Sequence, residues 1–235
     1  ELKIPEYIDG KKITEIGNRA FGDCKNVTSL ELPDSVEVLG GYLFAGGGDS
    51  LVSLKLPANE IKEAKICEQW FSDIHWCFSF GPFAGCSKLR NVEIPKGWTK
   101  VPASLFEDCS GLENVKIPET VTELGARAFL GSKISYVVIP DSVKTIDYEC
   151  FGGCPFKGLI GGRNLQLISE YDYKSDEYNW DGEERPYATF GDGTGTFYGY
   201  KGSYLEKWTI DHEDYVEEET EFQDYYCLDD KWETD

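Results

Sequence analysis

The chain has 235 residues and a formal net charge of −20, from 43 Asp and Glu against 23 Lys and Arg; this length suffices for one large core or two small ones. The sequence has none of the Lys and Arg clusters that nucleic-acid or anionic-membrane binding needs, and its apolar runs are too short to span a bilayer. Residues 170–235 hold 21 acids and 5 bases, whereas residues 1–169 hold 22 acids and 18 bases.

An apolar residue followed by proline recurs along the first 140 residues and indicates an internal repeat. The pairs are Ile4-Pro5, Leu32-Pro33, Leu56-Pro57, Ile94-Pro95, Ile117-Pro118 and Ile139-Pro140, at spacings of 28, 24, 38, 23 and 22 residues. Each unit contains a short β-like segment, a Gly, a Phe, and then Cys or a small residue. One such unit cannot bury its apolar face alone, so the copies are expected to stack into a solenoid with a continuous core.

The first unit departs from the others at both of its ends. Residues 2–5 have the phase of the last strand of a unit, which predicts further protein upstream. Asp9-Gly10, between Ile8 and Lys11, suits a type I′ turn. A two-residue hairpin here would explain the length of this unit.

Each proline follows a segment in which apolar and polar residues alternate, as in a strand with one buried face. In residues 91–94 and their equivalents, Val92 and Ile94 are expected to point inward, and Asn91 and Glu93 outward. Proline lacks an N–H and ends the ladder there. Residues 36–40 and 122–125 predict a second short strand in each unit.

The pair Phe-x-x-Cys occurs four times, at Phe21, Phe83, Phe106 and Phe151, and predicts one helical turn with both side chains on one face. Metal ligation, disulfides and repetition are three possible explanations. Gly47 and Ser132 replace Cys in two units, which favours a small buried residue over a ligand. Zinc sites use close CxxC pairs, which this sequence lacks. A cross-unit disulfide such as Cys86–Cys109 is the remaining alternative to buried free thiols.

Units such as Phe106 to Pro118 and Ala128 to Pro140 resemble the BspA-like leucine-rich repeat family in their register, Phe, Cys and Pro. The resemblance covers residues 1–168, as about six units. It implies an α/β leucine-rich-repeat solenoid, a β-rich right-handed coil with short helical turns and a C-terminal cap. It also implies a surface protein of anaerobic microbes that adheres to proteins. Any signal or anchor is expected outside this sequence.

The third unit is 38 residues long and carries about 15 extra residues around positions 61–81. Insertions of this kind map to loops and often to a binding face. The candidate binding residues in this insert are Trp70, His75 and Trp76. The alternative is a self-packed excursion that covers the flank of the solenoid. A Cys67–Cys77 disulfide is compatible with export, whereas zinc on Cys, His and Asp73 is disfavoured by irregular spacing.

Residues 169–235 are interpreted as an acidic C-terminal cap region. Within it, residues 199–208 resemble the element that closes many such arrays. Ser203 and Glu206 have the spacing of a helix capping box. Tyr204 and Trp208 would then share one helix face and cover the open end of the core.

Catalytic and cofactor motifs are scarce. The only histidines are His75 and His212, and Gly191 to Gly195 lacks the Lys of a P-loop. No catalytic residue, cofactor or metal site is predicted. A weak calcium candidate consists of Glu177, Asn179 and Asp181, but Ala188 stands where a closing carboxylate belongs. An acidic hairpin turn is the alternative interpretation.

The outward residues of the stacked strands form the candidate binding strip, about 25 Å long at the usual strand spacing. Its candidate residues are Glu31, Lys55, Glu93, Asn114, Lys116, Tyr136 and Val138. Strand propensity alone is the alternative reason for Tyr136 and Val138. The predicted function is non-enzymatic, extracellular or cell-surface recognition of a protein or another surface macromolecule. A structural spacer that presents another domain is the alternative, and a hydrolase that uses acidic tail residues is the more distant one.

Overall fold

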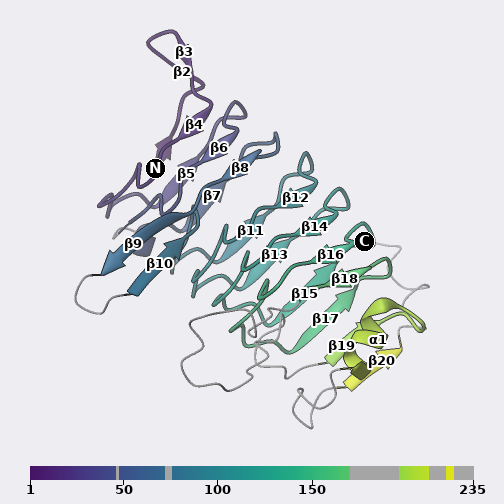
Figure 1. The fold of residues 1–235 in the computed structure, drawn as a ribbon. Helices are drawn as coiled ribbons and strands as arrows, with labels where there is room; N and C mark the ends of the chain where they lie inside the picture. The colour runs from purple at the N-terminus through teal and green to yellow at the C-terminus, as the bar shows by residue number, and fades with distance from the viewer. Residues whose placement is uncertain (46–47, 72–75, 170–195, 212–220, 225–235) are drawn as a thin grey trace.

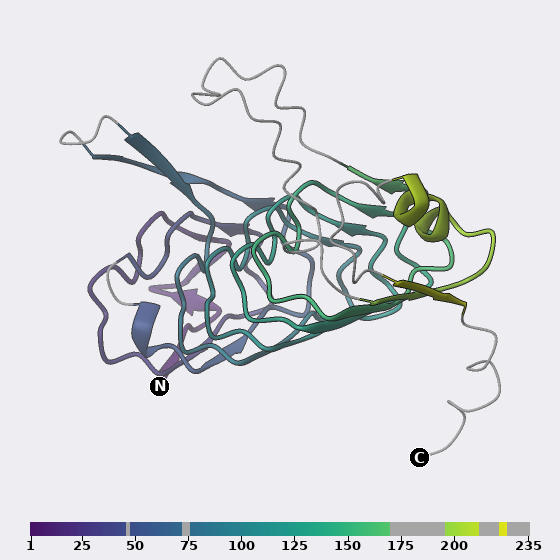
Figure 2. The ribbon, with the colours of Figure 1, turned by 90° about the horizontal axis from the view of Figure 1, so that it is seen from below.

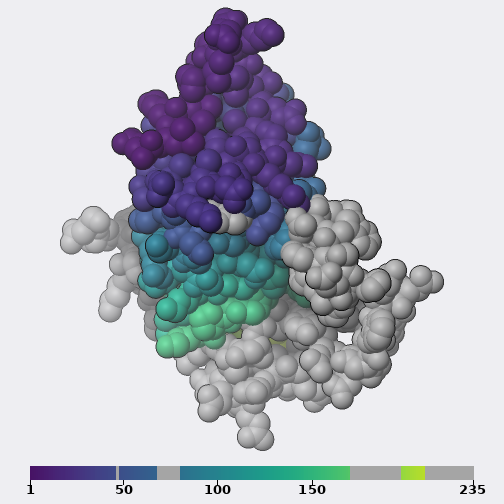
Figure 3. Space-filling model, turned by 90° about the vertical axis from the view of Figure 1, so that its left-hand side faces the viewer, coloured from purple at the N-terminus to yellow at the C-terminus, as the bar shows by residue number. Residues whose placement is uncertain are grey.

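The chain forms a stack of coils, and each coil passes through two short parallel strands and a side made of tight turns (Figure 1). The computed structural model describes residues 1–45, 48–71, 76–169, 196–211 and 221–224. In the space-filling view the coils follow one another as bands from purple to green (Figure 3). The predicted solenoid is therefore confirmed, with very little helix.

The first ladder contains the strands that precede the repeated prolines, followed by three strands that no proline follows. Its strands are β1 (Leu2–Lys3), β5 (Ser29–Glu31), β7 (Ser53–Lys55), β11 (Asn91–Glu93), β13 (Asn114–Lys116), β15 (Tyr136–Ile139), β17 (Gly158–Gly161), β19 (Thr196–Gly199) and β20 (Glu221–Asp224). The hydrogen-bonded pairs are parallel and keep the register of the repeat, with Leu2 opposite Leu30 and Val92 opposite Val115. Val92 and Ile94 are buried and their neighbours Asn91 and Glu93 are exposed, as the alternation predicts.

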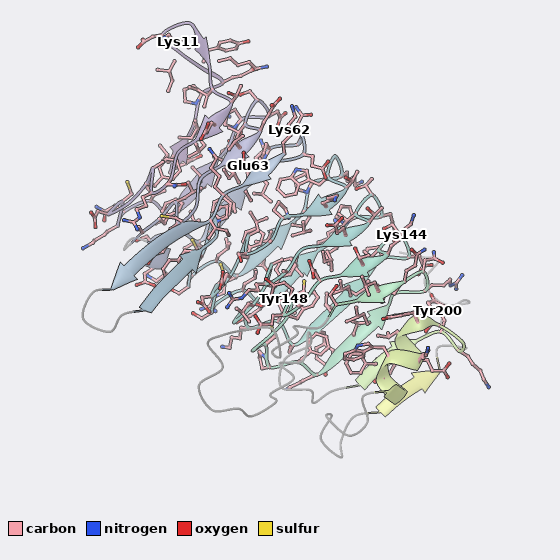
Figure 4. All side chains as sticks on the ribbon, viewed as in Figure 1. Lys11, Lys62, Glu63, Lys144, Tyr148 and Tyr200 are labelled. Carbon is pink, nitrogen blue, oxygen red and sulfur yellow. The ribbon has the colours of Figure 1, made fainter. Side chains whose placement is uncertain are left out.

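The second ladder contains the shorter strands that follow the prolines. Its strands are β4 (Glu15–Ile16), β6 (Val38–Leu39), β8 (Glu63–Ala64), β12 (Lys100–Val101), β14 (Glu123–Leu124), β16 (Thr145–Ile146) and β18 (Leu167–Ile168). They pair in parallel as β4-β6-β8 and β12-β14-β16-β18. Exposed residues such as Lys62, Glu63 and Lys144 follow this side of the solenoid (Figure 4). The second strand that the sequence predicts is therefore confirmed.

The third side of each coil consists of tight turns rather than the expected helical turn. Along this side, the backbone N–H groups of successive residues alternate between an acceptor in their own coil and an acceptor in the next coil. Those of Ala128, Leu130 and Ser132 donate within their own coil, and those of Arg127, Phe129 and Gly131 donate to carbonyls of the next coil. A helix would direct all its N–H groups along one axis. Alternating directions instead require residues with a positive φ, in the left-handed region, at intervals along the chain. Arg127 and Gly131 supply them, with φ of 57° and 66°.

The same backbone geometry explains the third position of the Phe-x-x-Cys motif. Asp23, Gly85, Asp108 and Gly153 occupy this position, as does Gly131 in the unit where Ser132 replaces Cys, and all have positive φ. Gly and Asp are among the residues that adopt this conformation most readily. The motif therefore combines a buried Phe, a left-handed residue and a small buried residue.

The core is a column of apolar side chains between the three sides. The rings of Phe83, Phe106, Phe129 and Phe151 stack from coil to coil, with centroids 5.7, 5.9 and 5.3 Å apart. Cys86, Cys109 and Cys154 are buried beside this column as free thiols, and Cys24, in the first coil, is half-buried. The buried-thiol interpretation is confirmed for the first three, and the Cys86–Cys109 disulfide is not formed.

Two hairpins project from the solenoid. The first joins β2 (Tyr7–Ile8) to β3 (Lys11–Lys12), and positive φ at both Asp9 and Gly10 gives the predicted type I′ turn. The second is formed by the insert in the third unit, as β9 (Cys67–Phe71) and β10 (Trp76–Phe80). Its register places Cys67 opposite Phe80 and Cys77 opposite Trp70. Cys77 is therefore displaced from Cys67 by three residues, roughly 10 Å along a strand, which exceeds the Cα separation of a disulfide. This register rules out the Cys67–Cys77 disulfide.

The junction between the third and fourth coils contains an irregularity that side chains compensate. Ile61 follows Pro57 by four residues, whereas Val36 follows Pro33 by three. The carboxylate of Glu60 accepts the backbone N–H groups of Thr99 and Lys100 at 2.7 and 2.8 Å. The fully buried Trp98 donates its indole N–H to the carbonyl of Pro57 at 3.0 Å. A short 3₁₀ helix, η1 (Gly48–Ser50), lies in the second coil.

The C-terminal end of the stack is covered by helix α1 (Tyr204–Asp211), which follows β19 (Figure 2). The Ser203 hydroxyl accepts the N–H of Glu206 at 3.3 Å, and the Glu206 carboxylate accepts the N–H of Gly202 at 2.6 Å. Buried Trp208 packs edge-on against Phe197, with centroids 6.0 Å apart. The predicted N-cap by Ser203 and the end plug are confirmed, whereas the Glu206 carboxylate binds the N–H of Gly202 and not that of Ser203, as a capping box requires. Because β19 and β20 also continue the first ladder, the boundary at residue 168 stays a prediction.

Candidate binding surface

The outward side chains of the first ladder line one side of the solenoid, here called the strand strip, along the three hydrogen-bonded groups β1-β5-β7, β11-β13 and β15-β17-β19-β20. Its N-terminal half, from β1 to β13, carries charges that neutralise one another. The Glu31 carboxylate lies 2.9 Å from the ammonium of Lys3 and 2.8 Å from that of Lys55. Hydrogen bonds from Lys55 and Lys3 lower the pKa of Glu31. Binding here would have to desolvate charges that already have partners.

The next pair of strands repeats this arrangement. The Lys116 ammonium lies 3.0 Å from the Glu93 carboxylate. Beside it, the Asn114 side-chain amide donates to Asn91 Oδ1 at 2.9 Å. Four of the predicted binding residues, Glu93 and Lys116 with Glu31 and Lys55, therefore belong to cross-strand ion pairs. Such pairs in water contribute little free energy but fix side-chain positions.

From β15 to β19 the strand strip carries large apolar side chains. On β15, Tyr136 is 59% exposed and Val138 is 61% exposed, whereas Val137 and Ile139 are buried. Half-buried Ile160 on β17 lies opposite Val138, and Tyr198 on β19 lies opposite Ile160. Gly158 lies between Tyr136 and Thr196 and adds no side chain. We call Tyr136, Val138, Ile160 and Tyr198 the apolar end of the strand strip.

Sequence reasoning missed Ile160 and Tyr198 because the repeat loses its proline after β15. Gly161 and Gly162 replace the apolar-Pro step. A Cβ on Gly161, whose φ is +105°, would lie 2.2 Å from the carbonyl oxygen of Ile139. The signal that locates β17 is the spacing of 22 residues, which relates Val143 to Leu165 and Ile146 to Ile168. For Tyr198 the sequence offers only the alternation of residues 196–199.

Other large apolar side chains are exposed elsewhere in the described part of the chain. They are Tyr7, Ile8, Val52, Ile66 and Leu167. Tyr7 and Ile8 lie in the first hairpin, and the other three are scattered over different coils. The apolar end of the strand strip differs because its members occupy adjoining strands on one face.

The two binding surfaces that the sequence predicts, the strand strip and the insert in the third unit, do not meet. The insert leaves the coil between the second ladder and the turns, at the corner opposite the strand strip, and the β9–β10 hairpin projects from there (Figure 2). Trp70 and Trp76 pair with neighbours of the other strand of this hairpin, but their side chains and all of His75 lie outside the described residues. The insert therefore stays a separate candidate surface.

A third cluster of charged groups lies on the side of the turns. Glu107 is only 5% exposed, and its carboxylate lies 3.5 Å from the guanidinium of Arg127. Arg127 also lies 3.0 Å from Glu149. Burial raises the pKa of Glu107, and Arg127 offsets this only in part. Burial likewise raises the thiol pKa values of Cys109, Cys150 and Cys154, which makes these cysteines poor nucleophiles.

Several sequence predictions fall on residues that the structure does not describe. They are the calcium candidates Glu177, Asn179 and Asp181, the Gly-rich stretch 191–195, and His212. Within the described ranges, no group of three His, Cys, Asp or Glu side chains is arranged to hold a metal ion. The same ranges contain no helix long and apolar enough to cross a membrane.

Parallel ladders, a proline-ended strand and a stacked Phe column define a leucine-rich-repeat solenoid. The sequence matches the BspA-type leucine-rich-repeat region, in six copies, over residues 2–76 and 77–176. The chain belongs to this family. No curated protein sequence is significantly similar to it.

Solved structures share this architecture. A leucine-rich-repeat protein of T. pallidum superposes with a TM-score of 0.51 at 20% identity, over 94% of this chain and 85% of that protein. A leucine-rich cell surface protein of Faecalibacterium prausnitzii gives 0.39 at 22% identity, over 72% of this chain and 47% of that protein. The pneumococcal vaccine antigen PcpA gives a TM-score of 0.42 at 18% identity, over 92% of this chain and 60% of that protein. At 20% identity, the likeness to the T. pallidum protein shows the fold alone.

Proposed function

We propose that this protein is a non-enzymatic recognition module that binds another macromolecule through the apolar end of its strand strip. The observation that carries the proposal is the exposure of Tyr136 and Val138 on a face where the neighbouring coils carry paired polar groups. Burial of apolar side chains stabilises a complex, and aromatic residues are favoured anchors in interfaces. The paired charges of the N-terminal half would then form the polar rim of the contact.

An extracellular or cell-surface location, with adhesion as its role, is part of the same proposal. It rests on the resemblance of the repeat to surface proteins of this family. Labelling of intact producing cells with an antibody against the chain tests the location independently of binding. Signal that appears only after permeabilisation would contradict a surface location.

Binding is tested by probing protein and glycan arrays with the purified chain and its variants. We expect Tyr136→Ala combined with Lys116→Glu to weaken the strongest interactions, while the free energy of unfolding changes by no more than about 1 kcal/mol. Val52→Ser is the matched control, because it removes an exposed valine outside the apolar end. The control should bind as the wild type does.

Two other outcomes would assign the surface differently. Loss of binding with Trp76→Ala, together with normal binding by the double variant, would place the partner on the insert. A chain that binds nothing on either array would favour the spacer alternative, in which the solenoid only holds another domain at a distance.

A further inference from the structure

Two lysines at the leading edge of the apolar end indicate the charge of its partner. Lys133 and Lys157 precede β15 and β17, and both are exposed. The N–H of Lys157 donates to the carbonyl of Ser135 at 2.7 Å, which fixes this lysine beside the residue that precedes Tyr136. Within the described residues neither ammonium has an ion-pair partner. At the corresponding edge two coils earlier, by contrast, Arg90 pairs with Glu113 at 3.3 Å.

No carboxylate offsets these two charges in the adjoining sequence. Residues 131–140 and 153–160 contain no Asp or Glu. At the opposite edge Asp141 lies 3.7 Å from Arg163, and the Arg163 guanidinium stacks on the Tyr200 ring at 4.0 Å. No carboxylate of these two segments therefore balances the two lysines, in a chain whose net charge is −20. On the strip itself, the acid Glu221 of β20 lies opposite Thr196, two strands away from β17. An anionic partner would be attracted to this edge and repelled by most of the remaining surface.

The apolar end also restricts the chemical class of this partner. Nucleic acids bind to rows of cations and stacking rings, whereas here two lysines precede the strands that carry aliphatic Val138 and Ile160. β17 is hydrogen-bonded to β15 on one side and to β19 on the other, so its backbone offers no free edge to an added strand. Contact must come from side chains. Apolar side chains next to carboxylates complement this surface.

We propose that the apolar end of the strand strip binds a polypeptide segment of another protein in which Asp or Glu residues flank apolar side chains. The apolar side chains of the segment pack on Tyr136, Val138 and Ile160, and its carboxylates lie against Lys133 and Lys157. This assignment rests on the proposed function and specifies its partner.

Selection of random short peptides displayed on phage against the whole chain tests it. We expect the recovered peptides to place Asp or Glu beside Leu, Phe or Trp. Fluorescence anisotropy with these synthetic peptides should show that Lys133→Glu with Lys157→Glu weakens binding about tenfold. The matched control is Lys25→Glu with Lys88→Glu, which reverses two exposed lysines before earlier strands of the same ladder. Added salt should weaken wild-type binding and leave the Lys133/Lys157 variant nearly unaffected.

The remaining outcomes separate the two proposals. Peptides that are weakened by Tyr136→Ala with Val138→Ser but not by the lysine reversal would overturn the acidic partner and leave the proposed function intact. Peptides that bind every variant equally, or a selection that recovers none, would overturn both. Lysine-dependent binding to phosphatidylglycerol vesicles with no peptide binding would assign the edge to a membrane surface and overturn the peptide.

Discussion

At the scale of single residues, position in the stack decides what a side chain contributes. Phe106 lies between Phe83 and Phe129, so its ring has an aromatic neighbour on each side. Phe21, in the first coil, has its ring centroid 5.2 Å from that of Phe44 and retains some exposure. The same residue type is therefore expected to stabilise the fold by different amounts in the middle and at the end of the column.

We expect Phe106→Ala to lower the free energy of unfolding by about 3–5 kcal/mol, as for other buried aromatic truncations. The cavity would adjoin two coils at once. Phe21→Ala should cost less, because fewer contacts are lost. Urea denaturation of the three proteins measures the difference, and equal stability of wild type and Phe106→Ala would contradict the stacked arrangement.

The thiols provide a second test at this scale. Cys86, Cys109 and Cys154 should react with a thiol reagent only after denaturation, because they are buried. Among the four equivalent cysteines, the half-buried Cys24 should react first in the folded protein, which corrects the expectation that all four are buried alike. Mass spectrometry of the labelled peptides identifies the order. Labelling of Cys109 before Cys24 would show that the central coils open more readily than the first.

Glu107 has a predictable effect on the pH dependence of stability. Because its pKa is raised above the ordinary value of 4.5, the folded state holds this proton more tightly than the unfolded state. Its contribution is present below pH 4.5 and is lost as the pH rises through the higher folded-state pKa. Glu107→Gln removes this titration, although Arg127, Ser104, Asp108 and Glu149 still surround the site. The wild type should therefore lose stability relative to the variant as the pH rises above 4.5. A gap that stays constant as the pH rises, in urea titrations, would contradict the assignment.

At the scale of elements, strands of two to four residues persist because each is one rung of a ladder. Between the third and fourth coils, β8 and β12 do not pair, and the Glu60 carboxylate accepts the backbone N–H groups that a paired strand would otherwise bind. Burial alone would raise the pKa of Glu60, but the hydrogen bonds from Thr99 and Lys100 outweigh it and lower the pKa. The extra residue between Pro57 and Ile61 thus places the Glu60 carboxylate where it accepts these two hydrogen bonds.

Glu60→Ala should destabilise the fold by about 1–3 kcal/mol, because two backbone N–H groups lose a charged acceptor. The loss should concentrate at the junction and appear as faster hydrogen exchange at Thr99 and Lys100. Glu63→Ala, which removes an exposed carboxylate from the adjoining strand, is the matched control. Unchanged exchange at both amides in Glu60→Ala would show that water or another group replaces the carboxylate.

At the scale of the whole molecule, each coil depends on its neighbours, so the ends of the stack are its weakest points. Helix α1 covers the C-terminal end through fully buried Leu205 and through Trp208. We expect Trp208→Ala to loosen the last coils before the centre, with early hydrogen exchange in β17 and β19. The exposed neighbour Lys207→Ala should leave exchange unchanged. Uniformly faster exchange along the whole solenoid would contradict such end-to-centre unfolding.

The sequence by itself determined the repeat, the inward and outward faces of the strands, the first hairpin and the helix cap. Each of these depends on near neighbours along the chain or on a fixed spacing, as with Val92 and Glu93 or with Ser203 and Glu206. Tight turns in place of helical ones were not predictable, because the next coil supplies the acceptors for Arg127 and Phe129. Only the tertiary structure decided that Ile160 lies between Val138 and Tyr198, that Lys157 lies beside Ser135 at the edge of these strands, and that the insert leaves from the opposite corner. Those relations depend on which coils stack and in what register, and no local pattern encodes them once the proline that marks each coil is lost after Pro140.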